Sequence, residues 1–332
     1  MTDPPCFDSG FEWSLPAMVQ NTEEYIHRTQ EPAVGGPPSR GKRRISAGTF
    51  LIPLVFMLLH HAVLNGISLA RAFSYLLSNP ALGAELRANP KDSSILLKIL
   101  VESKTMIYAS LFGMIILIPI YSFYLYRRRK KQDLPSLFKT VTWVQSLSSV
   151  AIILGALGLT QLWMAILGSF DQASAIGRLF QNYLDKMVLF DAASSVSALD
   201  FAATVLLVPI GEELLFRGIV QGALGKSFPA AVSVAGTTVL FALFHLDLIQ
   251  GSYVLIAGFA LSLACYLTRS IIVPIAMHMV FNFIGSGWLF RLTGAGRQAE
   301  EIIVCTLYAF ILIGFAGVLV LRRTGGKQGG AV

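Results

Sequence analysis

Residues 106–126 read MIYASLFGMIILIPIYSFYLY, and no side chain among them carries a charge. A helix of about 20 apolar residues crosses the hydrocarbon core of a bilayer, which is about 30 Å thick. The segment is therefore long and apolar enough to span a membrane. It is followed at once by the cations of residues 127–131, and such clusters mark the cytoplasmic end of a span.

The rest of the chain has the same apolar character. Of its 332 residues, 54% are hydrophobic and 14% are charged, and the mean hydropathy is +0.64. Soluble domains contain about 45–50% apolar and about 25% charged residues, so much of this chain needs the bilayer as its solvent. The apolar segments do not show the alternating pattern of a membrane barrel. We therefore predict an all-α, polytopic membrane bundle of about eight transmembrane helices.

A transmembrane domain over residues 48–323 would contain all the expected spans. These spans cover residues 49–70, 106–126, 141–166, 198–221, 230–249, 252–268, 271–290 and 301–321. Only Gln250, Gly251 and a few neighbours separate the fifth from the sixth. Residues 1–47 are expected to form a flexible cytoplasmic tail, and the Gly-rich residues 324–332 a disordered C-terminal tail.

Two loops contain amphipathic stretches, which we expect at the outer interface of the membrane. One runs from Ser93 to Val101 after the potential helix cap Asp92, and the other from Ile176 to Phe190. The three cysteines, at positions 6, 265 and 305, are too far apart in sequence to indicate a disulfide framework or a metal site.

Positive charge is distributed unevenly between the loops. If the N-terminus lies in the cytoplasm, the loops on that side carry 15 Lys and Arg residues and the opposite loops carry nine. Because positive residues concentrate on the cytoplasmic side, we expect both termini there, in a bacterial inner membrane. Basic clusters in these positions indicate topology, so the net charge of +7 does not predict nucleic-acid binding. The lipid bilayer is the first expected partner.

Residues capable of chemistry first appear in the fourth span, in the segment PIGEELLFRG, residues 209–218. An acid at the centre of a spanning helix costs about 2.5–3.5 kcal/mol on insertion scales, so such acids lie inside the bundle and pair or act chemically. Glu213 and Arg217 share a helix face and can form an ion pair. Glu212 points about 100° away, has no such partner, and suits a general base acting on water. The preceding proline and glycine loosen the helix and free backbone polar groups. A purely structural ion-paired cluster is the alternative interpretation.

Two later spans carry polar pairs at helical spacing. Phe241 and His245 share one face of the fifth span, and His278 and Asn282 share one face of the seventh. Imidazole and carboxamide groups one turn apart can both donate hydrogen bonds to an oxyanion. Each pair alone is also consistent with ordinary interhelical hydrogen bonding. Together with Glu212 they provide the groups for hydrolysis of an amide bond by an activated water.

The depths expected for these residues do not agree fully. Counted at about 1.5 Å per residue, Glu212 and His278 lie about 12–14 Å from the cytoplasmic face. The same count places His245 about 20–24 Å deep, unless the fifth span starts later or tilts.

The series Glu-Glu-x-x-x-Arg, Phe-x-x-x-His and His-x-x-x-Asn resembles that of the CAAX-protease and bacteriocin-processing (CPBP) family of intramembrane proteases. The resemblance covers residues 198–290 and implies a catalytic core there. The position matching Glu212 is the catalytic glutamate, with His245 helping to activate water. His278 and Asn282 match the groups that stabilise the oxyanion. Glu213, Arg217 and Phe241 are expected to support the site.

The resemblance implies an intramembrane endopeptidase that hydrolyses a peptide bond near the C-terminus of a membrane-associated or lipidated protein, its expected substrate. A non-catalytic immunity or partner-binding protein on the same scaffold is the runner-up. A third possibility is a transporter that uses Glu212 and Glu213 as a proton relay.

No cofactor is expected to be required. A divalent metal such as zinc is the alternative, held by Glu212, His245 and His278 in a two-histidine, one-carboxylate site. His60 and His61, adjacent in the first span, fall outside the motifs and are expected to be packing or interface residues.

Overall fold

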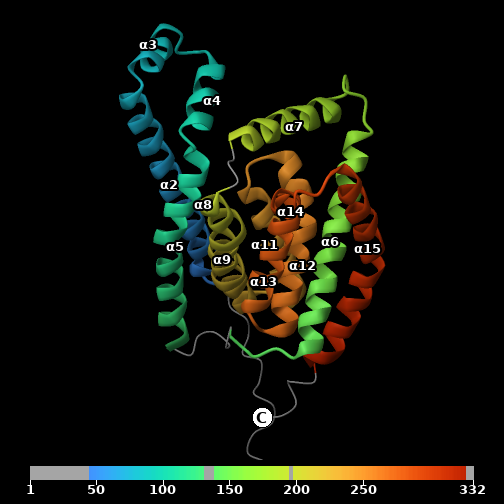
Figure 1. Cartoon of the computed structure of the whole chain (residues 1–332). Coiled ribbons are helices and arrows are strands. Elements are labelled where there is room, and N and C mark those ends of the chain that lie inside the picture. The colour runs from blue at the N-terminus through green and yellow to red at the C-terminus, as the bar shows by residue number, and fades with distance from the viewer. Residues whose placement is uncertain (1–44, 131–137, 194–196, 327–332) are drawn as a thin grey trace, which may run out of the picture. The chain divides into compact units, whose positions relative to one another are not determined.

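Helices make up nearly all of the chain that the structure describes (Figure 1). The computed structural model describes residues 45–130, 138–193 and 197–326, which belong to one compact unit, Arg44–Val332. Within these residues the β pairing is a single isolated bridge, between Phe138 and Ser270. The all-α prediction is therefore confirmed. Residues 1–44 and 327–332, parts of the expected tails, lie outside the described residues.

Among the described residues, five helices are long and apolar enough to cross a membrane. They are α2 (Ala47–Ser78), α5 (Thr105–Lys130), α6 (Trp143–Gly168), α12 (Leu248–Thr268) and α15 (Arg297–Gly326). Two shorter apolar helices, α11 (Ala230–Phe244) and α13 (Ile272–Gly285), match the expected fifth and seventh spans. The chain is thus a polytopic membrane bundle, and the count of eight spans stays a prediction.

The segment expected as the fourth span is a helix of changing pitch. It consists of α8 (Ala198–Phe201), the π-helical turn η1 (Ala202–Leu207), α9 (Val208–Glu213), the π-helical turn η2 (Leu214–Val220) and α10 (Gln221–Ser227). Single π-helical turns inside α-helices occur frequently at functional sites. Here they flank the short helix that carries both acids, Glu212 and Glu213.

The break between the fifth and sixth expected spans lies earlier than the sequence suggested. α11 ends at Phe244, whereas the span was expected to reach residue 249. The reason is Asp247, whose side chain accepts hydrogen bonds from the backbone N–H groups of Ile249 and Gln250, each at 3.0 Å, and so caps α12. The residue between the two helices, Leu246, adopts a left-handed backbone conformation with φ of 54°.

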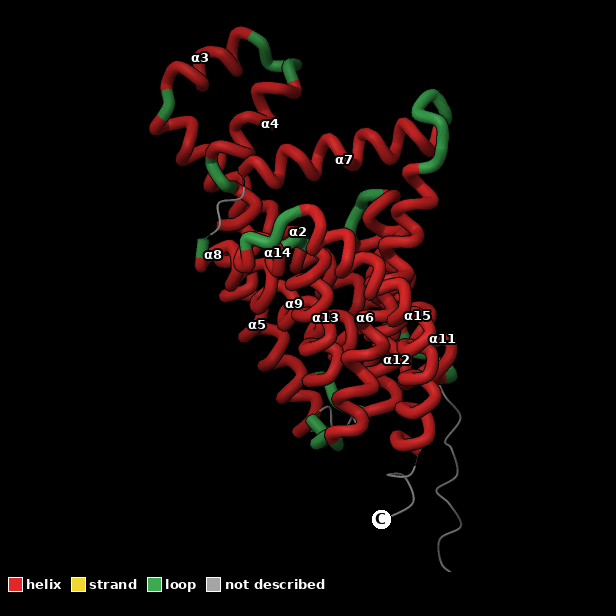
Figure 2. The backbone as a smooth tube through the Cα atoms, turned by 45° about the vertical axis from the view of Figure 1, so that its right-hand side comes forward, coloured by secondary structure: helices red, strands yellow, loops and turns green. Residues whose placement is uncertain are grey.

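The connecting segments carry short helices, α3 (Pro80–Ala88), α4 (Ser93–Glu102), α7 (Ala175–Ala193) and α14 (Trp288–Thr293). α4 and α7 confirm the helices expected from the two amphipathic stretches, and Asp92 caps α4 by accepting from Ser94 N at 2.9 Å. α7 runs crosswise to the long helices at one end of the bundle, as both backbone views show (Figure 2).

Two buried clusters hold the long helices together. The first joins α2, α5, the α9–η2 segment and α11 around fully buried residues such as Leu117, Tyr121 and Phe216. The second joins α6, α12, α13 and α15. In the second cluster α6 and α15 approach closely, since a Cβ on Gly155 would lie 2.7 Å from the carbonyl oxygen of Phe310. Small residues at such crossings are typical of membrane helices.

Candidate active site

A buried ion pair forms the base of the site. Glu213 Oε1 accepts from Arg217 Nη1 at 2.6 Å, one helical turn away, as the sequence spacing predicted. Neither side chain has any exposed surface. The second guanidinium nitrogen, Arg217 Nη2, donates to the carbonyl oxygen of Gly258 on α12 at 3.0 Å. This pair therefore ties the α9–η2 segment to α12.

The same carboxylate oxygen orients His278 on α13. His278 Nδ1 lies 2.7 Å from Glu213 Oε1. Because Arg217 already donates to this oxygen, Glu213 is the acceptor and Nδ1 carries the proton. The other ring nitrogen, Nε2, then faces Glu212, whose Oε2 lies 3.8 Å away. That separation is longer than a hydrogen bond, so the two groups face each other without direct bonding.

Glu212 differs from its neighbour in access as well as in partners. Its side chain keeps 12% of its surface exposed, whereas Glu213 keeps none. The sequence argument that helical geometry separates the roles of the two acids is consistent with this arrangement. Glu213 makes charged hydrogen bonds inside the protein, whereas the Glu212 carboxylate has no hydrogen-bond partner among the described residues.

His245 lies at the end of α11, as its C-cap. Its backbone N–H donates to Ala242 O at 3.3 Å, an i→i−3 bond that leaves the carbonyl of Phe241 without its usual helical donor. The imidazole fills that role, since Nδ1 donates to Phe241 O at 2.8 Å. The proton is therefore on Nδ1, and Nε2 is free to act as an acceptor. No direct hydrogen bond joins His245 to Glu212 in the described part of the chain.

The ring of Phe241 holds the motif residues of three segments together. Its centroid lies 5.0 Å from the ring of His245 and 5.9 Å from that of His278, and Arg217 Cζ lies 4.6 Å above its face. These contacts bring His245 and His278 to one aromatic ring, although the depth count placed His245 deeper than His278.

Asn282 lies one turn beyond His278 and is held by the irregular helix. Its Nδ2 donates to the carbonyl oxygen of Thr204 in η1 at 2.9 Å. The i→i+5 pattern of η1 pairs Val208 N–H with Ala203 O, so the next carbonyl, that of Thr204, would need an N–H at position 209. That residue is Pro209, which has none. Proline thus frees the acceptor that positions Asn282, and the second N–H of the carboxamide remains available.

Three residues that sequence reasoning did not assign to the site lie beside it. The hydroxyl of Tyr121 on α5 lies 3.1 Å from Nδ1 of His60 on α2. The rings of His60 and His61 pack against Phe244, the residue before His245, at 4.9 and 4.2 Å between centroids. The available signal was the pair of adjacent histidines in an apolar span, which the sequence analysis had assigned to packing.

The zinc alternative has no ready ligand set among the described side chains. No group of three or more His, Cys, Asp and Glu residues in residues 45–130, 138–193 and 197–326 has the arrangement of a metal site. His278 already uses one ring nitrogen on Glu213, and His245 uses one on a carbonyl. The set Glu212, His245 and His278 stays a prediction.

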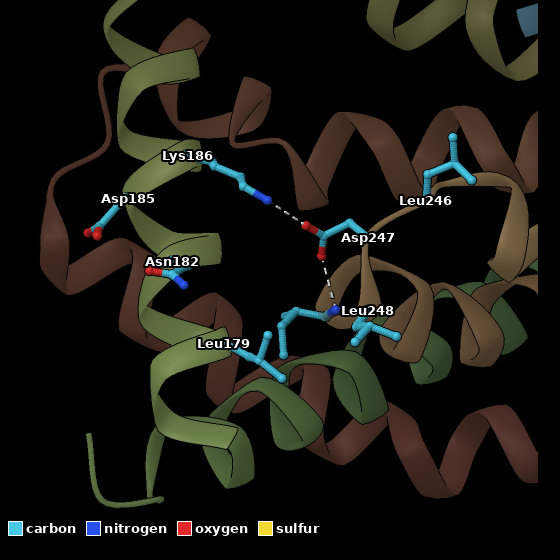
Figure 3. A pocket seen from close by; sticks show the side chains of 8 residues that line it. Leu179, Asn182, Asp185, Lys186, Leu246, Asp247 and Leu248 are labelled. Atoms are coloured by element: carbon cyan, nitrogen blue, oxygen red, sulfur yellow. Dashed lines mark hydrogen bonds and ion pairs between the residues drawn. The ribbon is translucent and has the colours of Figure 1, made fainter. Parts of the chain in front are cut away.

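A pocket lies just beyond His245, between α7 and the turn that starts α12 (Figure 3). It has a volume of about 380 Å³. Lys186 of α7 reaches across it to Asp247, with Nζ 3.1 Å from Oδ2. The crosswise helix is thereby tied to the loop that follows the histidine.

The comparison with known families agrees with the motif series. Residues 194–284 match a family model described as Type II CAAX prenyl endopeptidase Rce1-like. All the motif residues, from Glu212 to Asn282, fall inside this segment, and the resemblance to CAAX proteases is confirmed over it. No curated protein and no solved structure gives a significant match. The family match and the apolar helices support an integral membrane protein with a protease function in general, acting on a protein substrate.

Proposed function

We propose that this chain is an intramembrane endopeptidase in which Glu212 activates the attacking water. The observation that carries the proposal is the pairing of Glu212 Oε2 with His278 Nε2 across 3.8 Å, with His278 fixed from behind by a buried carboxylate. A gap of this length fits a reacting oxygen that hydrogen-bonds to both groups.

The reaction begins with proton transfer from water to Glu212. As that proton leaves, the water oxygen bonds to the carbonyl carbon of the scissile peptide, and the C=O π electrons move to the carbonyl oxygen. When the tetrahedral intermediate collapses, the C–N bond breaks and the proton held by Glu212 moves to the departing nitrogen. Glu212 ends as the carboxylate, ready for another cycle. His245 Nε2, an acceptor because Nδ1 is occupied, holds the second hydrogen of the water.

The oxyanion is stabilised by donors on α13. His278 Nε2 and the free N–H of Asn282 are the two donors, and each is preorganised by an acceptor on the segment Ala202–Glu213. Donation from Nε2 requires a doubly protonated imidazole. Should the enzyme require a metal, the same Nε2 atoms and Glu212 are the ligands we propose for it.

The substrate we propose is a membrane-associated protein, lipidated or not, cut near its C-terminus. The site lies on helices within the bilayer, so a substrate held at the membrane reaches it by lateral approach. This part of the proposal rests on the family match and on the apolar surroundings of the site.

For orientation we propose that both termini are cytoplasmic in a bacterial inner membrane. In the described bundle the basic end of α5, the end of α12 and the end of α15 lie at one end, and α7 lies at the other (Figure 1). Contact between Gly325 and Leu267 joins the last two of these ends. The positive end is the one that faces the cytoplasm.

The proposal is tested by comparing the C-termini of membrane proteins by mass spectrometry in cells that carry the native protein or Glu212→Gln at equal level. Glu300→Gln, an exposed acid-to-amide change at the start of α15, is the matched control. We expect a defined set of proteins to keep an extra C-terminal segment with Glu212→Gln alone. If the termini are identical in all three strains while Glu212→Gln rescues a deletion phenotype, the catalytic proposal fails and a partner-binding protein takes its place.

A further inference from the structure

A seam of buried polar groups runs between the η2–α10 segment and α12. Arg217 Nη2 donates to the carbonyl oxygen of Gly258 at 3.0 Å. One turn further along both segments, Gln221 Nε2 donates to the carbonyl oxygen of Ser262, also at 3.0 Å. The two bonds hold the segments side by side, and the polar side chains between them are directed into the protein.

The third wall of this seam is α11. Its residue Ser233 donates from Oγ to the carbonyl oxygen of Gln221 at 3.1 Å, and the ring of Phe241 lies 4.6 Å from Arg217 Cζ. Thr237 lies one turn from each of these two α11 residues and on the same helix face. Its side chain therefore faces the stretch between Arg217 and Gln221.

Four polar atoms of the seam have no hydrogen-bond partner among the described residues. They are Arg217 Nε, Gln221 Oε1, Thr237 Oγ1 and Ser262 Oγ. All four residues are more than nine-tenths buried, and the most exposed, Gln221, keeps 8% of its surface. The large majority of buried side-chain polar atoms are hydrogen-bonded. Four exceptions in one seam, from three neighbouring segments, indicate a partner that they share.

The chemistry of the four atoms selects that partner. It must accept from Arg217 N–H, donate to the Gln221 carbonyl, and do either towards the two hydroxyls. A cation would face a buried guanidinium, and an anion would face the carboxamide oxygen and the nearby carboxylate of Glu213. Water is neutral, donates and accepts, and makes about three hydrogen bonds when buried.

We propose that the seam binds internal water, shared by Arg217, Gln221, Thr237 and Ser262. The water completes the contact of the η2–α10 segment with both α11 and α12. It also leaves all three guanidinium nitrogens bonded, Nη1 to Glu213, Nη2 to the carbonyl of Gly258 and Nε to water. This inference goes beyond the proposed function and holds whether or not the protein cleaves peptides.

The direct test is an experimental structure of the full-length protein in lipid nanodiscs, at a resolution that shows ordered water. We expect a water about 2.7–3.0 Å from at least three of the four atoms. The inference is overturned if the seam contains no water and the two hydroxyls instead bond to carbonyls of their own helices, Thr237 to that of Ser233 and Ser262 to that of Gly258.

Thermal unfolding in detergent micelles gives an independent test, because the two alternatives predict shifts of opposite sign. Thr237→Val keeps the side-chain shape and removes the hydroxyl. If that hydroxyl holds a water, the melting temperature should fall by about 2–4 °C. If it has no partner, valine removes a buried unpaired group and the melting temperature should rise. Thr238→Val is the matched control, since that hydroxyl bonds only within its own helix, to Val234 O at 2.9 Å.

A double variant tests whether the water is shared. Ser262→Ala should also lower the melting temperature, and Thr237→Val with Ser262→Ala should lose less than the sum of the two, because either change already breaks the bridge. The inference is overturned if Thr237→Val melts no lower than Thr238→Val, or if the two losses simply add. No substrate enters these measurements, so their failure leaves the proposed function intact, and an active Glu212→Gln leaves the water site intact.

Discussion

Replacing Glu213 by Leu together with Arg217 by Met should separate the stability of the site from its activity. Both native side chains are fully buried, and Glu213 Oε1 accepts from Arg217 Nη1 at 2.6 Å and from His278 Nδ1 at 2.7 Å. Either single change leaves a charge buried without its counter-ion, which costs about 3–5 kcal/mol. The double change orphans no charge. It leaves His278 Nδ1 and Gly258 O without their bonds, so we expect it to lie within about 2 kcal/mol of the native protein.

Activity should not follow stability in this series. Without Glu213 nothing turns His278 Nε2 towards Glu212, and the loss of one oxyanion donor slows catalysis by about 10²–10³-fold. Unfolding in detergent micelles, followed by circular dichroism, ranks the stability of the native protein, both single variants and the double variant. Peptide cleavage ranks their activity. A double variant that cleaves at the native rate, or that is less stable than either single variant, would refute the reasoning.

Two further predictions concern groups around the site. Burial opposes ionisation of Asp247, but hydrogen bonds from Gln250 N–H and from Lys186 outweigh it and hold its pKa below the usual 3.8. The stability that this carboxylate contributes is present above pH 3.8 and is lost as the pH falls through its lower pKa in the folded protein. Asp247→Ala should therefore lower the melting temperature at neutral pH and leave it unchanged at a pH below that pKa. The expected loss at neutral pH is that of a helix cap, about 1 kcal/mol. Equal melting temperatures at neutral pH would contradict it. For Gly258→Ala, a Cβ would lie 2.9 Å from Cδ1 of Phe241, and pushing that ring off its contacts should cost about 1–3 kcal/mol and lower cleavage. Unchanged unfolding and cleavage would show that the close approach is not needed.

The parts of the site that follow from one helix could be predicted from the sequence. The Glu213–Arg217 ion pair depends only on a spacing of four residues, and the structure contains it. The bond between Glu213 and His278 also depends on how α13 is rotated against α9, and a single sequence contains no information about that rotation. The same holds for Tyr121 and His60, whose meeting depends on the packing of α2 against α5.

The end of α11 was predicted wrongly although a signal existed. Asp247 is a good N-cap residue, and it begins α12 before the expected boundary at Gln250 and Gly251. The expectation gave more weight to the continuous apolar composition than to the cap. Placing the break at Asp247 would have given the fifth span its observed end.

Irregular backbone gives His245 and Asn282 their fixed acceptors. In the hydrocarbon core an unpaired carbonyl is tolerated only where the protein itself supplies a donor. Pro209 frees the carbonyl of Thr204 and Asn282 fills it, while the tightened end of α11 frees the carbonyl of Phe241 and His245 fills it. The two backbone defects are thus satisfied by two side chains that the proposed reaction needs in fixed positions. A regular helix in place of either defect would leave Asn282 or His245 without its backbone acceptor. Any change in the backbone at these two positions should therefore be accompanied by a loss of activity.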